Sequence, residues 1–117
     1  MSIFEISPLE HGAGLKLSGE LDLAAARQLR EALLSDVPQE GELSLDLSEL
    51  EFVDSSGVAT ILAYAGERNG NGSLVLLNAT KPVTRVFELA RLGQHPCIEV
   101  RRSGLSRMSG GNSQSPN

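Results

Sequence analysis

The sequence predicts an α/β domain with a mixed, mostly parallel sheet of four to five strands, packed with three to four helices. Three observations support this prediction. The chain has 117 residues, which is about the length of one domain. Its apolar residues switch repeatedly between the alternation typical of strands and the three-to-four spacing typical of helices. These segments follow one another in turn, an order that implies right-handed crossovers and parallel neighbouring strands.

Five segments are expected to form the sheet. Apolar and polar residues alternate at 15–17 and, more regularly, at 43–48. Residues 74–77 are continuously apolar, which suits a central strand. A weak final strand is expected at 98–100, and the isoleucines of 3–6 indicate another at the edge. Because Ser and Asp occupy alternate positions of 43–48, we expect part of one sheet face to be open to water.

Three helices are expected between these strands. The first follows Asp22, a good N-cap, and the second carries apolar residues at helical spacing from Val58. Asn69-Gly70 is a plausible end for this second helix. The third has Thr80 as its candidate cap, a proline in its first turn and Gly93 as its end.

The composition excludes several classes of function. Fifteen acidic residues against ten basic ones give a net charge of −5, which argues against sequence-independent binding of nucleic acid. Cys97 is the single cysteine, so an internal disulfide framework and an all-cysteine metal site are excluded. His11 and His95 are far apart in the sequence. We therefore expect no bound metal and no cofactor.

The two ends of the chain also carry information. Residues 1–8 lack the pattern of a secretory signal, and no apolar run is long enough to cross a bilayer. The expectation is a cytoplasmic protein without membrane insertion. Residues 1–101 are expected to form the domain. The Ser/Gly-rich segment 102–117 has too few apolar groups to offset its ordering entropy, and we predict a disordered tail.

The most informative segment runs from Asp46 to Val58. It leads from a strand, through a short connection, into a helix, so Ser55 and Ser56 fall at the first positions of that helix. This edge of an open α/β sheet is where ligands usually bind. A helix N-terminus carries partial positive charge and unpaired N–H groups, so an oxyanion attached to a hydroxyl there is favourably placed.

Other interpretations of these residues remain. Asp-Ser-Ser-Gly before a helix is also a simple cap, with Gly57 easing close packing. Serine hydrolysis is disfavoured because the G-x-S-x-G spacing is absent and neither histidine is placed by the sequence as a base. The carboxylates of 20–22 and 49–54 are more typical of solvated loops and caps than of acid–base catalysis. The glycine-rich segment 66–72 lacks the ending of a phosphate-binding loop. We expect no catalytic residue.

At this point the sequence resembles a known family. Asp54-Ser55-Ser56-Gly57, preceded by residues 46–48 and 52–53, is similar to the signature of STAS domains, specifically of bacterial anti-sigma factor antagonists. Gly19-Glu20-Leu21-Asp22, followed by an Ala-rich helix, resembles the N-terminal motif of that family. Residues 82–93 resemble its last helix.

The resemblance extends over residues 3–100 and implies a single STAS domain that works as a protein-binding switch. In the family, the serine directly after the Asp is phosphorylated, which here corresponds to Ser55. Asp22, Asp54, Ser56 and Gly57 are implied to belong to the partner-binding surface with it. The differences are small, at Ala24-Ala25 and Val58-Ala59, where the family more often has polar residues and Leu-Gly.

The implied partners are two proteins. One is an anti-sigma factor with a histidine-kinase-like ATPase fold, which acts as a serine kinase, and the other is a PP2C-type phosphatase. The unphosphorylated antagonist is implied to bind the anti-sigma factor and free the sigma factor, and phosphorylation to break that complex. An alternative is a STAS adaptor that binds a different ATPase, as in an ABC-type lipid transporter, or a signalling scaffold.

Overall fold

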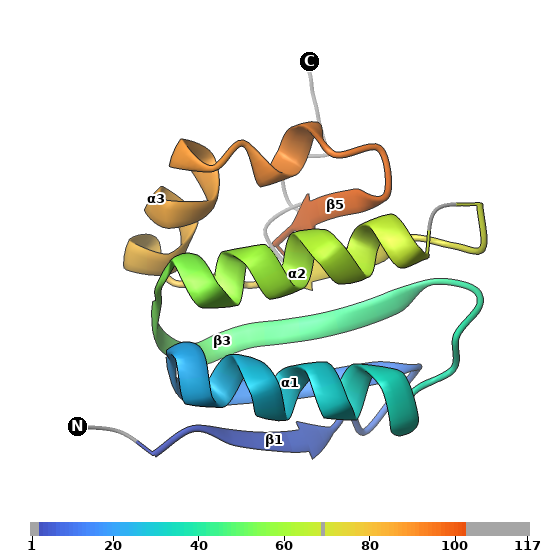
Figure 1. The fold of residues 1–117 in the computed structure, drawn as a ribbon, viewed down its shortest axis with the longest axis horizontal. Helices are drawn as coiled ribbons and strands as arrows, with labels where there is room; N and C mark the ends of the chain where they lie inside the picture. The colour runs from blue at the N-terminus through green and yellow to red at the C-terminus, as the bar shows by residue number, and fades with distance from the viewer. Residues whose placement is uncertain (1–2, 69, 103–117) are drawn as a thin grey trace.

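The computed structural model describes residues 3–68 and 70–102, which form one α/β unit (Figure 1). Its elements, in chain order, are β1 Glu5–Pro8, β2 Gly14–Leu21, α1 Leu23–Ser35, β3 Leu43–Val53, α2 Ser55–Glu67, β4 Leu74–Leu77, α3 Lys81–Leu89, the 3-10 turn η1 Leu92–Gln94 and β5 Ile98–Arg101.

The strands form one sheet in the order β1-β2-β3-β4-β5. β1 pairs antiparallel with β2, whereas β2 with β3, β3 with β4 and β4 with β5 pair parallel. The predicted α/β class and the mostly parallel sheet are confirmed, and the expected edge strand is β1. β4 occupies an interior position, and Leu74, Val75 and Leu76 are fully buried there, as a continuous apolar run predicts.

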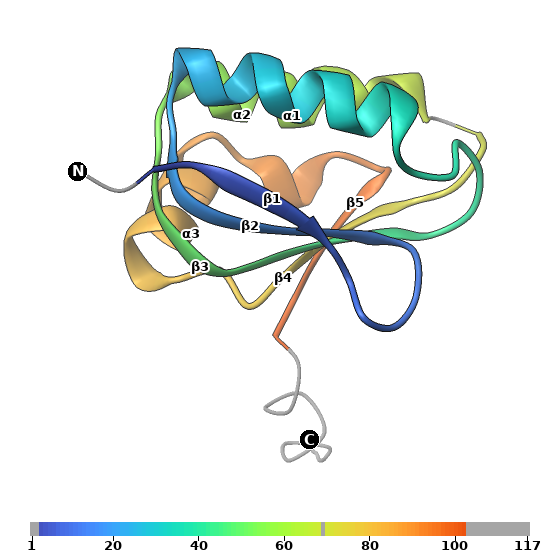
Figure 2. The same ribbon diagram turned by 90° about the horizontal axis from the view of Figure 1, so that it is seen from below.

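α1 and α2 lie side by side over one face of the sheet, and the other face carries no helix of the described chain (Figure 2). The core between sheet and helices is almost entirely aliphatic, and Tyr64 and Phe87 are its only buried aromatic residues among those described. The helix-free face is polar and reaches solvent, as expected: Asp46 is half-buried, Ser48 is exposed, and Lys16 pairs with Glu49 at 2.9 Å.

β3 is longer than its alternating pattern indicated. It continues from Leu43 to Val53, so a single residue, Asp54, separates it from α2. The register between β2 and β3 shifts twice, between Lys16 and Ser18 and between Gly19 and Glu20. These irregularities break the apolar alternation of the later part of β3, which is why the sequence indicated a connection where the strand continues.

α3 also ends earlier than expected. It stops at Leu89, and Arg91, rather than Gly93, adopts the left-handed conformation that turns the chain, with φ 57°. Gly93 lies within η1. Thr80 occupies the cap position, but its hydroxyl donates a hydrogen bond to the Leu50 carbonyl at 3.0 Å instead of accepting one from the helix.

The end of α2 is fixed by a buried arginine. Arg68 is 1% exposed and forms the C-cap, one residue before the expected stop. Its Nη1 donates to the carbonyl of Pro38 at 2.9 Å and to the hydroxyl of Tyr64 at 3.0 Å, and its Nη2 donates to the carbonyl of Gly41. Arg68 therefore ties the end of α2 to the segment that leads into β3.

Two expectations concern residues beyond this description. Asn69, expected at the helix stop, lies outside the described residues, and so does the segment 103–117 of the predicted tail. Among the described helices, none combines the length and the apolar character needed to cross a bilayer.

Candidate functional site

The candidate site lies at the edge where β2 and β3 end. Leu21 and Val53, the last residues of the two strands, are register partners, so Asp22 and Asp54 follow at neighbouring positions. The Asp54 amide donates to the Leu21 carbonyl at 3.2 Å, which holds the two strand ends together. α1 and α2 both begin here, with their first turns at the same end of the molecule (Figure 1). We call Asp22, Asp54, Ser55 and Ser56 the rim.

Asp54 is the N-cap of α2. Its Oδ1 accepts hydrogen bonds from the amides of Ser56 at 2.9 Å and Gly57 at 3.2 Å. Extended backbone at Asp54, with φ −106° and ψ −173°, gives the carboxylate its reach over the first turn. The cap interpretation of this motif is therefore correct, and it fixes the conformation in which Ser55 is presented.

Ser55 is the first residue of α2, and its side chain is exposed. Within residues 3–68 and 70–102 its hydroxyl makes no hydrogen bond. Ser56 follows and is half-buried. Of the two side chains, that of Ser55 is thus the more exposed.

Gly57 lies beneath the rim. A Cβ atom at this position would lie 2.7 Å from Leu21 Cγ and 2.7 Å from Val53 Cγ2. Both of these side chains are buried at the ends of β2 and β3. Gly57 therefore allows the first turn of α2 to pack directly on the sheet. This packing sets how far Ser55 stands above the strand ends.

Asp22 supplies the second carboxylate of the rim. It is exposed and caps α1, where its Oδ1 accepts from the Ala25 amide at 3.0 Å. The partially positive N-termini of α1 and α2 each have a carboxylate in place. A further negative group on Ser55 would therefore add to the charge of Asp54 and Asp22.

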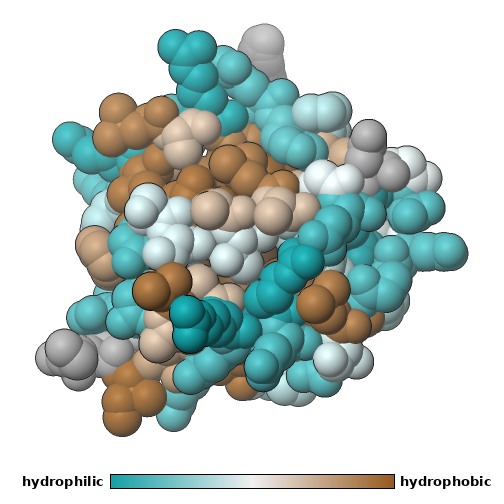
Figure 3. Space-filling model, in the orientation of Figure 1, coloured by the Kyte–Doolittle hydropathy of each residue, from teal (hydrophilic) through white to brown (hydrophobic). Residues whose placement is uncertain are grey.

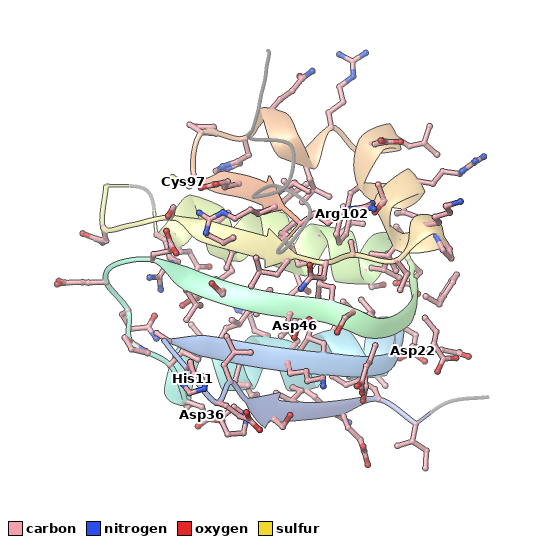
Figure 4. All side chains as sticks on the ribbon, turned by 180° about the vertical axis from the view of Figure 1, so that it is seen from behind. His11, Asp22, Asp36, Asp46, Cys97 and Arg102 are labelled. Carbon is pink, nitrogen blue, oxygen red and sulfur yellow. The ribbon has the colours of Figure 1, made fainter. Side chains whose placement is uncertain are left out.

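The two histidines lie away from this edge. His11 precedes β2 and His95 precedes β5, so both lie at the amino ends of these strands, whereas Asp22 and Ser55 follow the carboxyl ends. Figure 4 shows His11 and Asp22 at opposite ends of the sheet. In the described part of the chain, no group of three or more metal-ligating side chains is found.

Two exposed apolar side chains next to the rim were not identified from the sequence. Leu23 at the start of α1 is 57% exposed, and Phe52 near the end of β3 is 47% exposed. Leu23 stands outside the buried stripe of α1, which a helical projection could have indicated. Phe52 falls on the outward side of β3 when the alternation of Leu43, Leu45 and Leu47 is continued, so the strand pattern could have indicated its exposure as well.

The chain is similar to two curated anti-sigma factor antagonists. It is 26% identical over 101 residues to the anti-sigma-B factor antagonist of Bacillus subtilis, which covers 86% of this chain and 93% of the relative. It is 29% identical over 99 residues to the anti-sigma F factor antagonist of Lysinibacillus sphaericus, with 82% and 85% covered.

Solved structures share the fold. An anti-sigma factor antagonist from Mycobacterium paratuberculosis matches with a TM-score of 0.68 at 19% identity, over 95% of this chain and 93% of that one. The antagonist SpoIIAA in its unphosphorylated form matches with a TM-score of 0.62 at 23% identity, over 96% and 100%. SpoIIAA in its phosphorylated form matches with a TM-score of 0.56 at 22% identity, over 94% and 100%.

The model of one protein family, described as "Mlab, STAS domain", matches residues 6–102. This match includes every described strand and helix apart from the first residue of β1. The two curated relatives match 86% and 82% of this chain, and the solved structures share its fold. The family that the rim motif resembled is thus confirmed: this chain belongs to the STAS domain family.

Proposed function

We propose that this protein is an anti-sigma factor antagonist controlled by phosphorylation of Ser55. The unphosphorylated form binds an anti-sigma factor and thereby releases the sigma factor, and phosphorylation abolishes this binding. The observation that carries the proposal is the exposed Ser55 hydroxyl at the first position of α2, presented beside two capping carboxylates. The names of the relatives agree with it.

The proposed modification is a phosphoryl transfer. The anti-sigma factor, a serine kinase with a histidine-kinase-like ATPase fold, transfers the γ-phosphoryl group of ATP to Ser55 Oγ. ADP leaves, and the hydroxyl proton passes to solvent. A PP2C-type phosphatase hydrolyses the ester with water, which regenerates the hydroxyl and releases inorganic phosphate. In this proposal the protein itself catalyses no reaction, takes no cofactor or nucleic acid, and works in the cytoplasm.

Electrostatics explains why the modification would break the complex. A phosphoserine adds about −1.5 to −2 charges and three acceptor oxygens. At Ser55 it would stand next to Asp54, near Asp22, on a chain whose net charge is already −5. A partner surface packed closely on Ser55 would meet a bulky dianion among carboxylates. A loss of about 3 kcal/mol there weakens binding by about 10²-fold.

The test is reconstitution with purified components. The histidine-kinase-like anti-sigma factors encoded by the source organism are each mixed with this protein and ATP, and the phosphate is located by mass spectrometry. We expect one of them to phosphorylate wild type and Ser56→Ala but not Ser55→Ala. In calorimetry, that anti-sigma factor should bind the unphosphorylated form of this protein and should not bind the phosphorylated form. Absence of binding to every one of these proteins would refute the proposal.

A second candidate is a STAS adaptor that binds the ATPase of an ABC-type lipid transporter or a signalling scaffold. The observation that favours it is the description of the matching family, which names Mlab. In that case the protein isolated from its own cells carries no phosphate on Ser55 and co-purifies with the transporter ATPase. Phosphate mapping together with identification of co-purified proteins therefore separates the two candidates.

A further inference from the structure

A groove runs between α1 and α2 and opens beside the rim. Its cavity volume is about 590 Å³, and both helices line it. Ala26 and Ala59 lie along its apolar part, and Ser56 and Thr60 add hydroxyl groups. Figure 3 looks onto this face and shows weakly polar to apolar surface over α2, beside strongly hydrophilic side chains over α1.

The α2 side of the groove carries no charge. From Ser55 to Gly66 the helix contains no ionisable side chain except the buried Tyr64. Ala59 is exposed on this uncharged stretch of α2, whereas the outer face of a surface helix usually carries charged or polar side chains. Leu23 at the mouth of the groove is 57% exposed. The groove therefore offers an apolar surface that this chain itself leaves uncovered in the part described.

The α1 side supplies a cation without a partner. Arg27 is exposed and lines the groove, and within residues 3–68 and 70–102 it forms no ion pair. Arg30, one turn further on, is already engaged by Glu67 at 2.6 Å. With about 1.5 Å of rise per residue, Arg27 lies about 6 Å along α1 from Leu23, and Glu31 about 12 Å. Within the groove, a segment entering from the rim thus meets the apolar Leu23 first, then Arg27, and only then the acidic Glu31.

We propose that this groove is the second half of the partner interface and receives a segment of the anti-sigma factor with an apolar side chain followed by a carboxylate. The inference rests on the proposed function and specifies what the partner presents. Ser55 and the groove residues Ser56, Ala59 and Thr60 belong to one helix. A segment lying in the groove and continuing past its mouth would cross the Ser55 hydroxyl. This arrangement couples docking in the groove to the modification at the rim.

The first test fills the groove and measures binding of the anti-sigma factor identified by reconstitution. Ala59→Arg places a long side chain in the groove. Ala63→Arg is its matched control, because Ala63 is exposed on the same helix, one turn later, and does not line the groove. We expect Ala59→Arg to weaken binding about 30-fold or more and Ala63→Arg about twofold or less, with equal melting temperatures.

The second test concerns the charge. Arg27→Glu is expected to weaken binding about tenfold or more and Arg27→Gln about threefold, with a smaller salt dependence of the dissociation constant in both. Arg85→Glu is the control. This substitution makes the same change in net charge at an exposed position on α3, away from the groove. This control should bind like wild type.

The outcomes separate the two proposals. If no anti-sigma factor binds the wild type, the proposed function and the groove proposal both fail. If Ser55→Asp abolishes binding while Ala59→Arg and Arg27→Glu bind like wild type, only the groove proposal fails. Equal losses in Ala59→Arg and Ala63→Arg would place the partner on the outer face of α2 and refute the groove. A dimer of wild type that Ala59→Arg dissociates, with partner binding unchanged, would make the groove a self-association surface instead.

Discussion

At the scale of single residues, Gly57 is where the rim meets the core. Its missing side chain lets α2 lie directly on Leu21 and Val53, and a Cβ atom would come within 2.7 Å of both. Gly57→Ala must displace buried side chains at the strand ends, which outweighs the better helix propensity of alanine. We expect the variant to lower the free energy of unfolding by about 1–3 kcal/mol in denaturant titrations.

Gly66→Ala is the matched control for this substitution. Gly66 lies in the same helix and is exposed, and an added Cβ atom meets nothing within 4 Å. Here only helix propensity acts, and we expect the free energy of unfolding to rise by up to about 1 kcal/mol. Equal stability of Gly57→Ala and wild type would show that the first turn of α2 is not packed as described.

Glu99 on β5 offers a prediction about pH. The hydrogen bond that its carboxylate accepts from Arg101 Nε at 2.8 Å, assisted by the guanidinium charge, holds the pKa of Glu99 below that of an ordinary glutamate. A folded-state pKa that is lowered gives stability present at neutral pH and lost as the pH falls through that pKa. Both side chains are exposed, so the effect on stability is small.

The measurement is an NMR titration of the Glu99 carboxyl carbon. Its midpoint should lie below the value of an ordinary glutamate in wild type and return to that value in Arg101→Gln. The same midpoint in both proteins would mean that the hydrogen bond between Glu99 and Arg101 is not populated in solution.

The residue roles at the rim were predictable where the chemistry is local. A carboxylate or hydroxyl before a helical pattern is a cap, and Asp22 and Asp54 act as the sequence predicted. Thr80 also precedes a helical pattern, but its hydroxyl donates a hydrogen bond to the Leu50 carbonyl and does not cap the helix. The burial of Leu50, in contrast, depends on the two register shifts between β2 and β3, and the pattern of β3 alone does not contain it.

At the scale of elements, Arg68 decides where α2 ends and how the chain enters β3. Its guanidinium is buried and donates to the carbonyls of Pro38 and Gly41 and to the Tyr64 hydroxyl. Arg68→Met keeps the apolar stem but leaves these acceptors without their donor, and we expect a loss of about 2–3 kcal/mol in the free energy of unfolding. Thermal and denaturant unfolding measure it.

Two further variants sharpen this prediction. Arg68→Lys keeps the charge but lacks the planar fork that reaches several acceptors, so it should be destabilised as well. Arg85→Met on the exposed side of α3 should change stability by no more than about 0.5 kcal/mol. A loss below about 1 kcal/mol in Arg68→Met would show that the network contributes little.

Element ends were the least predictable part of the fold. Glycine was expected to stop the second and third helices, but Arg68 caps one and Arg91 turns the chain after the other in the left-handed conformation. The first of these outcomes depends on a contact with a distant segment, because Arg68 reaches Pro38, 30 positions earlier in the chain. The pattern of apolar residues, in contrast, located the five described strands and three α-helices, though not the turn η1, because it reports which parts of an element are buried.

At the scale of the whole molecule, the order of strands and helices was enough to predict a mostly parallel sheet and to place Ser55 at its carboxyl-end edge, whereas the position of Asp22 near Ser55 was implied by the family resemblance. Right-handed crossovers leave few arrangements of four parallel strands. The open polar face was also predictable, from the alternating polar residues of β3. The groove between α1 and α2 was not, since its shape depends on how two helices separated by a long strand pack on each other.

The helix positions also govern how the molecule responds to charge at Ser55. The amides of Ser56 and Gly57 are already bonded to Asp54, so the fold does not need Ser55 to complete its cap. A negative group at the first helical position is stabilised by the helix dipole by about 0.3–1 kcal/mol, and repulsion from Asp54 and Asp22 opposes this gain. The two effects act in opposite directions, so the stability of the domain should hardly change.

Ser55→Asp is therefore expected to separate binding from folding. Its melting temperature should stay within about 3 °C of wild type, whereas its affinity for the anti-sigma factor should fall by about 10²-fold or more, because the added charge lies in the interface. Ser7→Asp on β1 makes the same charge change at an exposed site away from the rim and should bind like wild type. A large drop in melting temperature for Ser55→Asp, with binding intact per folded molecule, would mean that Ser55 serves the fold and not the partner.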